Sequence, residues 1–416
     1  MAANETHQAI EAVFRIERAR LIAGLARMVR DVDRAEELAQ DALLLALTAW
    51  PKSGVPDRPG AWLMATAKRR AIDGFRRDRM LARKHAEIVQ DLAEEEHPEI
   101  EAALDDEIGD ELLSLMFIAC HPMLSRDARA ALTLRLIGGL STDEIARAFL
   151  SSEPTIAQRI ARAKKSLGES GIAFETPRGR DRAARLASVL EVIYLIFNEG
   201  YAATAGEDLI RPALCAEALR LGRILAGIAS DEPEVFGLLS LMEVQASRLA
   251  ARTAPDGSPI MLPQQNRARW DHLLIRRGLA ALKRAEALDG ADGPYALQAA
   301  LAACHARARR SEDTDWVRIA SLYDRLRVVM PSPVVDLNRA IAHGMAHGPE
   351  TGLALLAQID AAALASYAPL PAARGDLLEK AGRRGEARTE FERASSLSRN
   401  ARERAFLLAR AAACAD

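Results

Sequence analysis

The chain has 416 residues and a net charge of −2, and 49% of its residues are hydrophobic but only 4% aromatic. This length excludes a single small core, and abundant Ala, Leu and Arg beside few aromatic residues favour helices over strands, so we predict an all-α protein of two to four domains. No apolar run approaches a membrane span, and the scattered cysteines Cys120, Cys215, Cys304 and Cys414 exclude a disulfide framework, so we expect a cytoplasmic protein that does not enter a membrane.

Two helices are predicted at the N-terminus. Helical periodicity covers residues 5–30, and Asp31 or Asp33 can cap a second helix. The Trp50-Pro51 pair is expected to end that helix, and its Pro and Gly residues make 51–60 a loop. The side predicted to be buried carries Leu38, Ala42 and Leu45, and the exposed side carries Asp33, Glu37, Gln40 and Asp41. Such a polar stripe suits a partner that bears Arg; a solvated helix face is the alternative.

A third helix is predicted over residues 61–80. Its basic residues include Lys68, Arg69, Arg70, Arg76 and Arg77. Single-stranded DNA needs a basic groove, because backbone phosphates supply most of the affinity, so this helix is a candidate DNA-binding element. Trp62 at its start can stack on a base or fill the domain core, and the core is the more frequent place for such a residue.

Charge is unevenly distributed over the first 170 residues. Residues 1–84 carry 16 Lys and Arg against 11 Asp and Glu, and residues 112–167 carry 8 basic against 4 acidic residues. Between them, residues 87–111 carry 12 acidic residues and no Lys or Arg. Two basic blocks joined by an acidic one do not suggest an evenly charged enzyme, and the acidic block is predicted to be a linker or a marginal helix.

The stretch LSTDEIARAFLSSEPTIAQRIARAKKSL, residues 140–167, has the signals of two helices separated by a short joint. Ser141 and Glu144 form a capping box at the first helix. Ser152 can cap the second helix, and Pro154 suits its first turn. One apolar stripe is predicted on the second helix, formed by Ile156, Ile160, Ala163 and Leu167.

The outer face of that second helix is polar and basic. It carries Thr155, Gln158, Arg159, Arg162 and Lys165. Gln and Arg suit base edges in a major groove, and Lys and Arg offset phosphate charge, so the pattern favours a helix-turn-helix that reads DNA. An ordinary helical hairpin with a solvated face is the alternative.

Residues 140–167 resemble the DNA-reading sigma-four domain of bacterial RNA polymerase sigma factors of the extracytoplasmic-function class. The shared residues are Leu140-Ser141, Glu144-Ile145-Ala146, Thr155-Ile156, Arg159 and Arg162-Ala163-Lys164. Residues 31–47 are similar to the sigma-two helix that binds core polymerase, and the family pattern of acids, Gln and a further acid matches Glu36, Glu37, Gln40 and Asp41.

Residues 59–79 resemble the next sigma-two helix, which opens the promoter and reads its melted element. The matching residues are Ala61-Trp62-Leu63, Ala67, Ala71-Ile72-Asp73 and Arg76-Arg77. This chain departs from the family at two positions, since Arg69 replaces the usual Asn and Arg70 an apolar residue. The base preference of the family therefore does not transfer to this helix.

The rest of the chain is predicted to be helix after helix. The turn at Gly382 has a counterpart 34 residues upstream at Gly348, and 34 is the tetratricopeptide period. In the last repeat we expect Gly375 where two helices cross, with Ala387 and Phe391 packing between them. Together with the segments NEGYAATAGEDLIRPALCAEALRLGRIL and PSPVVDLNRAIA, this region resembles the sigma-factor subgroup with a tetratricopeptide-like C-terminal extension.

The resemblance implies four parts: a sigma-two domain at 1–85, an acidic linker at 86–111, a sigma-four helix-turn-helix domain at 112–170, and a tetratricopeptide-like regulatory extension at 182–416. It implies an alternative sigma factor in the bacterial cytoplasm that binds core RNA polymerase and promoter DNA. The extension would modulate its activity through an unknown protein or small ligand. We expect no enzymatic activity, and therefore no catalytic residues, metal ligands or cofactors.

Two other functions stay open at this point. A one-component transcription regulator would combine the helix-turn-helix with a ligand- or protein-sensing helical domain and would act without binding core polymerase. A tetratricopeptide scaffold would use its N-terminal helices for packing alone and would have no DNA affinity.

Overall fold

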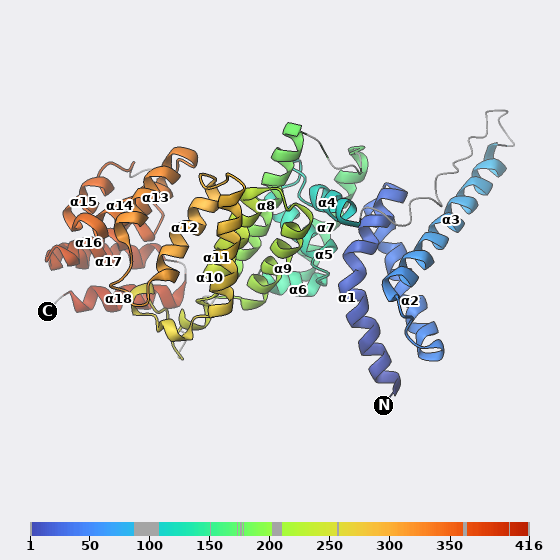
Figure 1. The fold of residues 1–416 in the computed structure, drawn as a ribbon, viewed down its shortest axis with the longest axis horizontal. Helices are drawn as coiled ribbons and strands as arrows, with labels where there is room; N and C mark the ends of the chain where they lie inside the picture. Colours follow the sequence, from blue (N-terminus) through green and yellow to red (C-terminus); the bar gives the residue numbers. More distant parts are fainter. Residues whose placement is uncertain are drawn as a thin grey trace. The chain divides into compact units, whose positions relative to one another are not determined.

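The structure of the protein is a computed structural model, and it describes residues 2–86, 108–149, 151–172, 174, 177, 179–201, 210–255, 258–360, 364–398 and 400–414. Within these ranges the regular elements are all helices, and an isolated bridge between Thr253 and Pro259 is the only β-type pairing (Figure 1). The prediction of an all-α protein is confirmed. The chain divides into two compact units, residues 1–192 and residues 193–416.

The first unit holds two groups of packed helices. Its elements are α1 (Ala2–Val29), α2 (Val32–Ser53), α3 (Pro59–Ala86), α4 (Ile108–Ala119), α5 (Arg126–Leu136), α6 (Thr142–Ala148), α7 (Glu153–Glu169) and the first part of α8 (Gly179–Tyr201). Helices α1, α2 and α3 pack against one another around buried Leu25, Trp50 and Leu63, and α4 lies on α1. Helices α5, α6 and α7 form the second group. The predicted acidic linker falls almost entirely outside the described residues.

Helix α2 ends later than the sequence suggested. It continues through Pro51 to Ser53, and the Gly54 N–H bonds the Trp50 carbonyl at 2.9 Å. The prediction that Trp50-Pro51 ends this helix is therefore wrong. Pro51 lies in the last turn, where its missing N–H removes a single hydrogen bond, and the helix ends instead at Gly54, whose φ of 82° suits glycine.

The second unit is an array of helical hairpins. Its elements are the end of α8, α9 (Pro212–Ile228), α10 (Pro233–Ala246), the short 3-10 helices η2 (Leu249–Ala251), η3 (Leu262–Gln264) and η4 (Arg267–Arg269), α11 (His272–Ala287), α12 (Pro294–Arg307), α13 (Trp316–Val329), α14 (Pro333–His347), α15 (Pro349–Leu356), α16 (Pro369–Lys380), α17 (Arg384–Leu397) and α18 (Ala401–Ala413). From α9 to α18, each α-helix packs against the next one in sequence. No helix within the described ranges is long and apolar enough to cross a membrane.

The predicted helix crossing in the last repeat is present. A Cβ atom added at Gly375 would lie 2.8 Å from the Phe391 ring, so only glycine lets α16 and α17 approach this closely. Ala387 and Phe391 are buried in the same cluster. Gly348 and Gly382, 34 residues apart, both have positive φ, at 102° and 78°. The assignment of this region to the tetratricopeptide class stays a prediction.

A glycine in α10 lies at a close contact between two helices of the second unit and gives a stability prediction. A Cβ at Gly237 would lie 2.6 Å from the backbone nitrogen of Ala296 at the start of α12, and backbone cannot rotate away. We expect Gly237→Ala to lower the free energy of unfolding by about 1–3 kcal/mol, as overpacking does. Gly227→Ala in α9 is the matched control, because nothing lies within 4 Å of its added Cβ. Urea unfolding of both variants tests this; an equal effect would contradict the predicted steric conflict.

Candidate nucleic-acid interface

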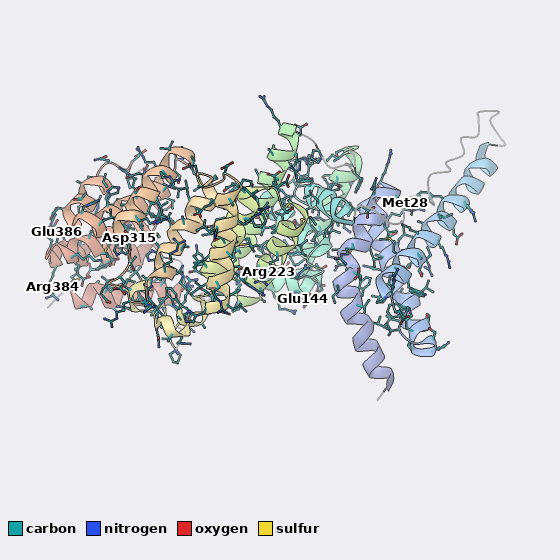
Figure 2. All side chains as sticks on the ribbon, in the orientation of Figure 1. Met28, Glu144, Arg223, Asp315, Arg384 and Glu386 are labelled. Atoms are coloured by element: carbon teal, nitrogen blue, oxygen red, sulfur yellow. The ribbon has the colours of Figure 1, made fainter. Side chains whose placement is uncertain are left out.

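The two helices predicted between residues 140 and 167 are present as α6 and α7. The Glu144 N–H donates to Ser141 Oγ at 3.1 Å, and the Ser141 N–H donates to the Glu144 carboxylate at 2.7 Å, so the predicted capping box is formed. Glu144 is labelled on α6 in Figure 2. Ser152 caps α7 by accepting from the Thr155 N–H at 3.3 Å.

The packing of α7 also matches the predicted pattern. Its buried residues are Ile156, Ile160, Ala163 and Leu167. They face the rest of the domain, since α7 packs against both α5 and α6. This packing leaves the opposite side of the helix available for a partner, as a DNA-reading helix requires.

The side chains on the outer face of α7 differ in whether they form hydrogen bonds or ion pairs with other described residues. Gln158 and Arg162 are exposed and make no side-chain hydrogen bond or ion pair with any described residue. Arg159 lies 3.4 Å from Asp127 of α5, and Lys165 lies 3.7 Å from Glu169. These carboxylates are largely exposed, and exposed ion pairs contribute little, so a phosphate or a base edge can replace them. Thr155 is exposed and its hydroxyl lies 2.7 Å from that of Ser152.

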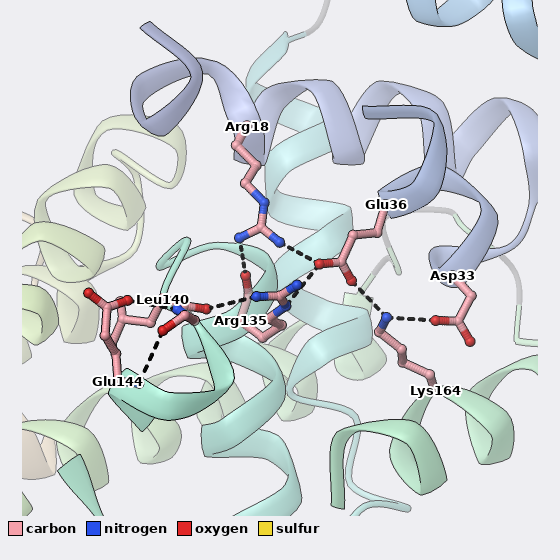
Figure 3. Close-up of polar contacts among 8 residues, drawn as sticks. Arg18, Asp33, Glu36, Arg135, Leu140, Glu144 and Lys164 are labelled. Carbon is pink, nitrogen blue, oxygen red and sulfur yellow. Dashed lines mark hydrogen bonds and ion pairs between the residues drawn. The ribbon is translucent and has the colours of Figure 1, made fainter. Parts of the chain in front are cut away.

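Lys164, beside this face, points inward and joins α7 to the N-terminal helices. Its ammonium lies 2.6 Å from Asp33 and 2.7 Å from Glu36, both on α2. Glu36 also pairs with Arg18 of α1, and with Arg135 of α5 at 2.9 Å. Figure 3 shows Arg18, Arg135 and Lys164 converging on the Glu36 carboxylate, while Asp33 contacts Lys164. We call this set of five residues, Arg18, Asp33, Glu36, Arg135 and Lys164, the Glu36 cluster.

The electrostatics of the Glu36 cluster follow from burial and charge. Burial alone would raise the pKa of Glu36, but Lys164, Arg135 and Arg18 outweigh it, and the pKa lies below its ordinary value. Burial alone would lower the pKa of Lys164, but Glu36 and Asp33 outweigh it and raise that pKa. Burial lowers the pKa of Arg18, which stays charged at neutral pH. Glu36, Lys164 and Arg18 are therefore charged near neutrality, and the buried carboxylate lies against three cationic side chains.

Sequence reasoning missed the role of Glu36, although one signal was present. Glu36 was matched only to an acidic family pattern, whereas its side chain is 5% exposed. It follows Ala35 and precedes Ala39 by one helical turn, and both alanines are buried. A carboxylate on an apolar helix side requires a cation partner, so the buried pairing was foreseeable, but its partners on distant helices were not.

Two of the four residues in the predicted polar stripe on α2 form ion pairs with other helices. Glu37 and Gln40 are exposed. Asp33 pairs with Lys164, as described above, and Asp41 pairs with Arg70 of α3. Leu44, 60% exposed one helical turn beyond Gln40, extends the stripe with an apolar residue that sequence reasoning had not included. All four predicted residues stay candidates for partner binding.

The basic helix α3 presents most of its predicted residues to solvent. Arg69, Arg70 and Arg76 are exposed and Lys68 is half-buried, while the side chain of Arg77 lies outside the described residues. Trp62 is half-buried, with its ring centre 5.3 Å from that of buried Trp50. Its expected place in the core is thus only partial.

Phe75 is an aromatic candidate that sequence reasoning passed over. It is 38% exposed beside Arg76, and the Arg34 guanidinium lies 5.5 Å from its ring centre. An exposed ring within a basic helix can stack on a base. Its position next to the Arg76-Arg77 pair was a usable signal in the sequence.

The described residues offer no metal centre, since no three His, Cys, Asp or Glu side chains among them are placed to hold an ion. Each of the four cysteines is buried and unpaired. Burial raises the pKa of Cys120 and of Cys215 to about 12, so these two thiols are held protonated and unreactive.

Three family models match the chain. They are sigma-70 region 2 over residues 13–80, sigma-70 region 4 over residues 114–167, and a family of unknown function (DUF6596) over residues 185–286. The first match covers α2 and most of α3, and the second covers α6 and most of α7. The third match lies in the helical region that follows α7.

Curated relatives span the chain to different extents. An uncharacterized protein of Rhizobium meliloti is 43% identical over 392 residues, which are 94% of this chain and 92% of that protein. The "Probable ECF RNA polymerase sigma factor SigI" from two strains of Mycobacterium tuberculosis is 28% identical over 192 residues, which are 44% of this chain and 62% of that protein. No solved structure matches the chain.

Proposed function

Because this chain belongs to one family with the Rhizobium meliloti protein and contains sigma-70 regions 2 and 4 in that order, we propose that it is an alternative sigma factor. It binds core RNA polymerase in the bacterial cytoplasm and directs it to specific promoters. Polymerase makes the phosphodiester bond, and this chain supplies recognition without covalent chemistry. The distant similarity to the SigI protein supports the extracytoplasmic-function class as the source of the first two domains.

The observation that carries this proposal is the combination of both regions in one chain. A helix-turn-helix alone suits many transcription regulators, but a region 2 domain ahead of it suits a protein that also contacts polymerase. In this proposal Thr155, Gln158, Arg159 and Arg162 read the upstream promoter element in the major groove, while Lys165 contacts the DNA phosphates. The exposed Arg69, Arg70 and Arg76 of α3, with Lys68 and Arg77, bind the melted strand.

Core polymerase binding is assigned to the polar stripe on α2, which comprises Asp33, Glu37, Gln40 and Asp41. We predict that Glu37→Arg weakens binding to core polymerase roughly 10- to 100-fold, because it places a like charge opposite an Arg-bearing partner. Asp57→Arg is the matched control, since Asp57 is exposed in the loop before α3 and has the same charge change. Titration of fluorescently labelled protein with purified core polymerase measures both; similar losses would remove the stripe from the proposal.

The helical region after α7 is proposed to modulate sigma activity through a protein or small ligand. The proposed domain boundaries stay at 1–85, 86–111, 112–170 and 182–416.

The end point of a truncated version is set by a contact between α5 and α8. Arg129, buried on α5, donates to Ser188 Oγ at 2.6 Å, and Ser188 in turn donates to the Cys120 carbonyl. A truncation after residue 170 would remove this partner, so a version lacking the extension should end after Val192, where the first compact unit ends.

Run-off transcription with purified core polymerase tests the function as a whole. The full-length chain should give specific transcripts from a subset of genomic promoters, and the version ending at Val192 should change their amount. A one-component regulator would bind DNA but would not co-migrate with core polymerase. If no promoter supported core-dependent transcripts, the sigma-factor proposal would be wrong.

A further inference from the structure

The second unit contains a cavity of about 480 Å³, a volume typical of small-molecule sites. It lies between the segment from Arg248 to Gln265 and the last helices, with Ile341 of α14 also on its wall. Apolar side chains form much of that wall, among them Met261, Leu262, Ile341, Phe391, Phe406 and Leu407. Nothing in the proposed DNA and polymerase contacts uses this cavity.

Two arginines at the cavity have no carboxylate partner among the residues that the structure describes. Arg248 donates to the Tyr201 hydroxyl at 2.8 Å and to the Gln245 side chain at 3.1 Å. Arg252 donates to the Tyr201 carbonyl, and its guanidinium lies 3.7 Å from the centre of the Tyr201 ring. Neither arginine makes an ion pair with a carboxylate of the described residues. Two guanidinium groups therefore lie against one aromatic ring, and no carboxylate of the described residues pairs with either of them.

The third arginine of the cavity behaves differently and serves as an internal comparison. Arg410 pairs with Asp376 at 2.7 Å and with Glu379, so its charge is matched within α16 and α18. For Arg252, burial lowers the pKa and neighbouring Arg248 adds to that effect. Leaving partly buried cations unpaired costs free energy, and an anion placed beside Arg248 and Arg252 would recover it.

We propose that this cavity binds a small amphipathic carboxylic acid, with its carboxylate on Arg248 and Arg252 and its apolar body against the wall formed by Met261, Leu262 and the last helices. A guanidinium fork matches a carboxylate in geometry, and the apolar wall disfavours a ligand that is charged throughout. The further claim, that the bound acid modulates transcription, rests on the proposed function.

Dansylglycine is a suitable probe, because it combines a carboxylate, a sulfonamide N–H and an apolar fluorescent body. Its uncharged analogue dansylglycinamide isolates the contribution of the carboxylate. The full-length protein should bind dansylglycine with enhanced fluorescence and should bind the amide roughly 10- to 100-fold more weakly, as expected for charged hydrogen bonds. Equal binding of the two probes would overturn the proposal.

Amino-acid substitutions test whether the probe binds in this cavity. Arg248→Gln and Arg252→Gln should each remove most of the preference for the acid over the amide, whereas Arg269→Gln, at an exposed position on η4 outside the cavity, should retain it. Because Arg252 also bonds a backbone carbonyl, thermal unfolding must accompany its measurement. Met261→Trp provides a second route, since this 38% exposed residue can fill the cavity without disturbing the core. Unchanged affinity of dansylglycine for the Met261→Trp variant and for both arginine variants would place the probe elsewhere and refute the site.

Transcription is measured separately from binding. Saturating dansylglycine should change run-off transcription by the full-length protein, and the Arg248→Gln variant should not respond. Binding without a change in transcription would refute the modulating role and leave the site intact. If core-dependent transcription were itself absent, the sigma-factor proposal would fail, while the binding result would stand on its own.

Discussion

Replacing Glu36 by Gln is expected to lower the free energy of unfolding of the first unit by about 3–5 kcal/mol, because removing one partner of a buried ion pair leaves the others uncompensated. Arg18, Arg135 and Lys164 all lie against this carboxylate, and the Glu36 and Arg18 side chains are only 5% and 8% exposed. Urea unfolding followed by circular dichroism measures the change. Glu37→Gln is the control: it is the neighbouring exposed carboxylate, and its loss should cost less than about 0.5 kcal/mol.

The same cluster predicts a pH dependence with a definite sign. The pKa of Glu36 is lowered in the folded protein from 4.5, so its stabilising contribution is present above pH 4.5 and is lost as pH falls through the lower folded value. The pKa of Lys164 is raised from 10.5, so its contribution is present below pH 10.5 and is lost as pH rises through the higher folded value. The stability difference between wild type and Glu36→Gln should therefore shrink on the acid side. A difference that stays constant down to pH 3 would contradict the ionised cluster.

The second large effect is expected at the outer face of α7. Replacing Gln158 and Arg162 together by Ala should reduce promoter-dependent run-off transcription roughly 100-fold, since each specific base contact contributes about 1–3 kcal/mol. These two residues are chosen because they are exposed and make no side-chain pairs with described residues, so their loss leaves the fold intact. Electrophoretic mobility shifts with promoter and scrambled duplexes separate lost specificity from lost affinity.

Three further variants separate base reading by α7 from phosphate contacts and from the effect of a cation on α6. Lys165→Ala should weaken binding equally to all sequences and reduce the salt dependence by about one phosphate contact. Asp127→Asn should strengthen DNA binding modestly, because it releases Arg159 from its 3.4 Å ion pair. Arg147→Ala on α6 removes an exposed cation that pairs with Asp143, and it should leave specificity unchanged. If Arg147→Ala were as damaging as the α7 double variant, α7 would not be the reading helix.

Local features of this protein were predictable from sequence. The Ser141–Glu144 capping box and the buried stripe of α7 follow from residue type and helical spacing, and both are present. The crossing at Gly375 was expected from the resemblance of the last repeat to a tetratricopeptide unit, and it is also present. These features depend on interactions within one or two neighbouring elements.

The features that were not predictable depend on distant partners. Glu36 and Lys164 are 128 residues apart, and no local pattern identifies one as the partner of the other. The same holds for Ser188, which packs against Arg129 across 59 residues and places the start of α8 in the first unit. The cavity of the second unit likewise combines Arg252 with Leu407, which belong to separate hairpins. Such pairings are fixed by tertiary packing, which sequence periodicity does not encode.

The pair between Asp41 and Arg70 has a thermodynamic consequence for the proposed sigma factor. Asp41 belongs to the stripe on α2 that is proposed to bind polymerase, and Arg70 belongs to α3, which is proposed to bind melted DNA. In the structure the two side chains form an ion pair. A phosphate that takes Arg70 releases Asp41 for the polymerase, and a polymerase arginine that takes Asp41 releases Arg70. The two associations are therefore linked, and each favours the other by the same factor. Because the pair is exposed, that factor is limited to about fivefold, the equivalent of about 1 kcal/mol, enough to bias strand opening toward the polymerase-bound state without holding DNA when polymerase is absent.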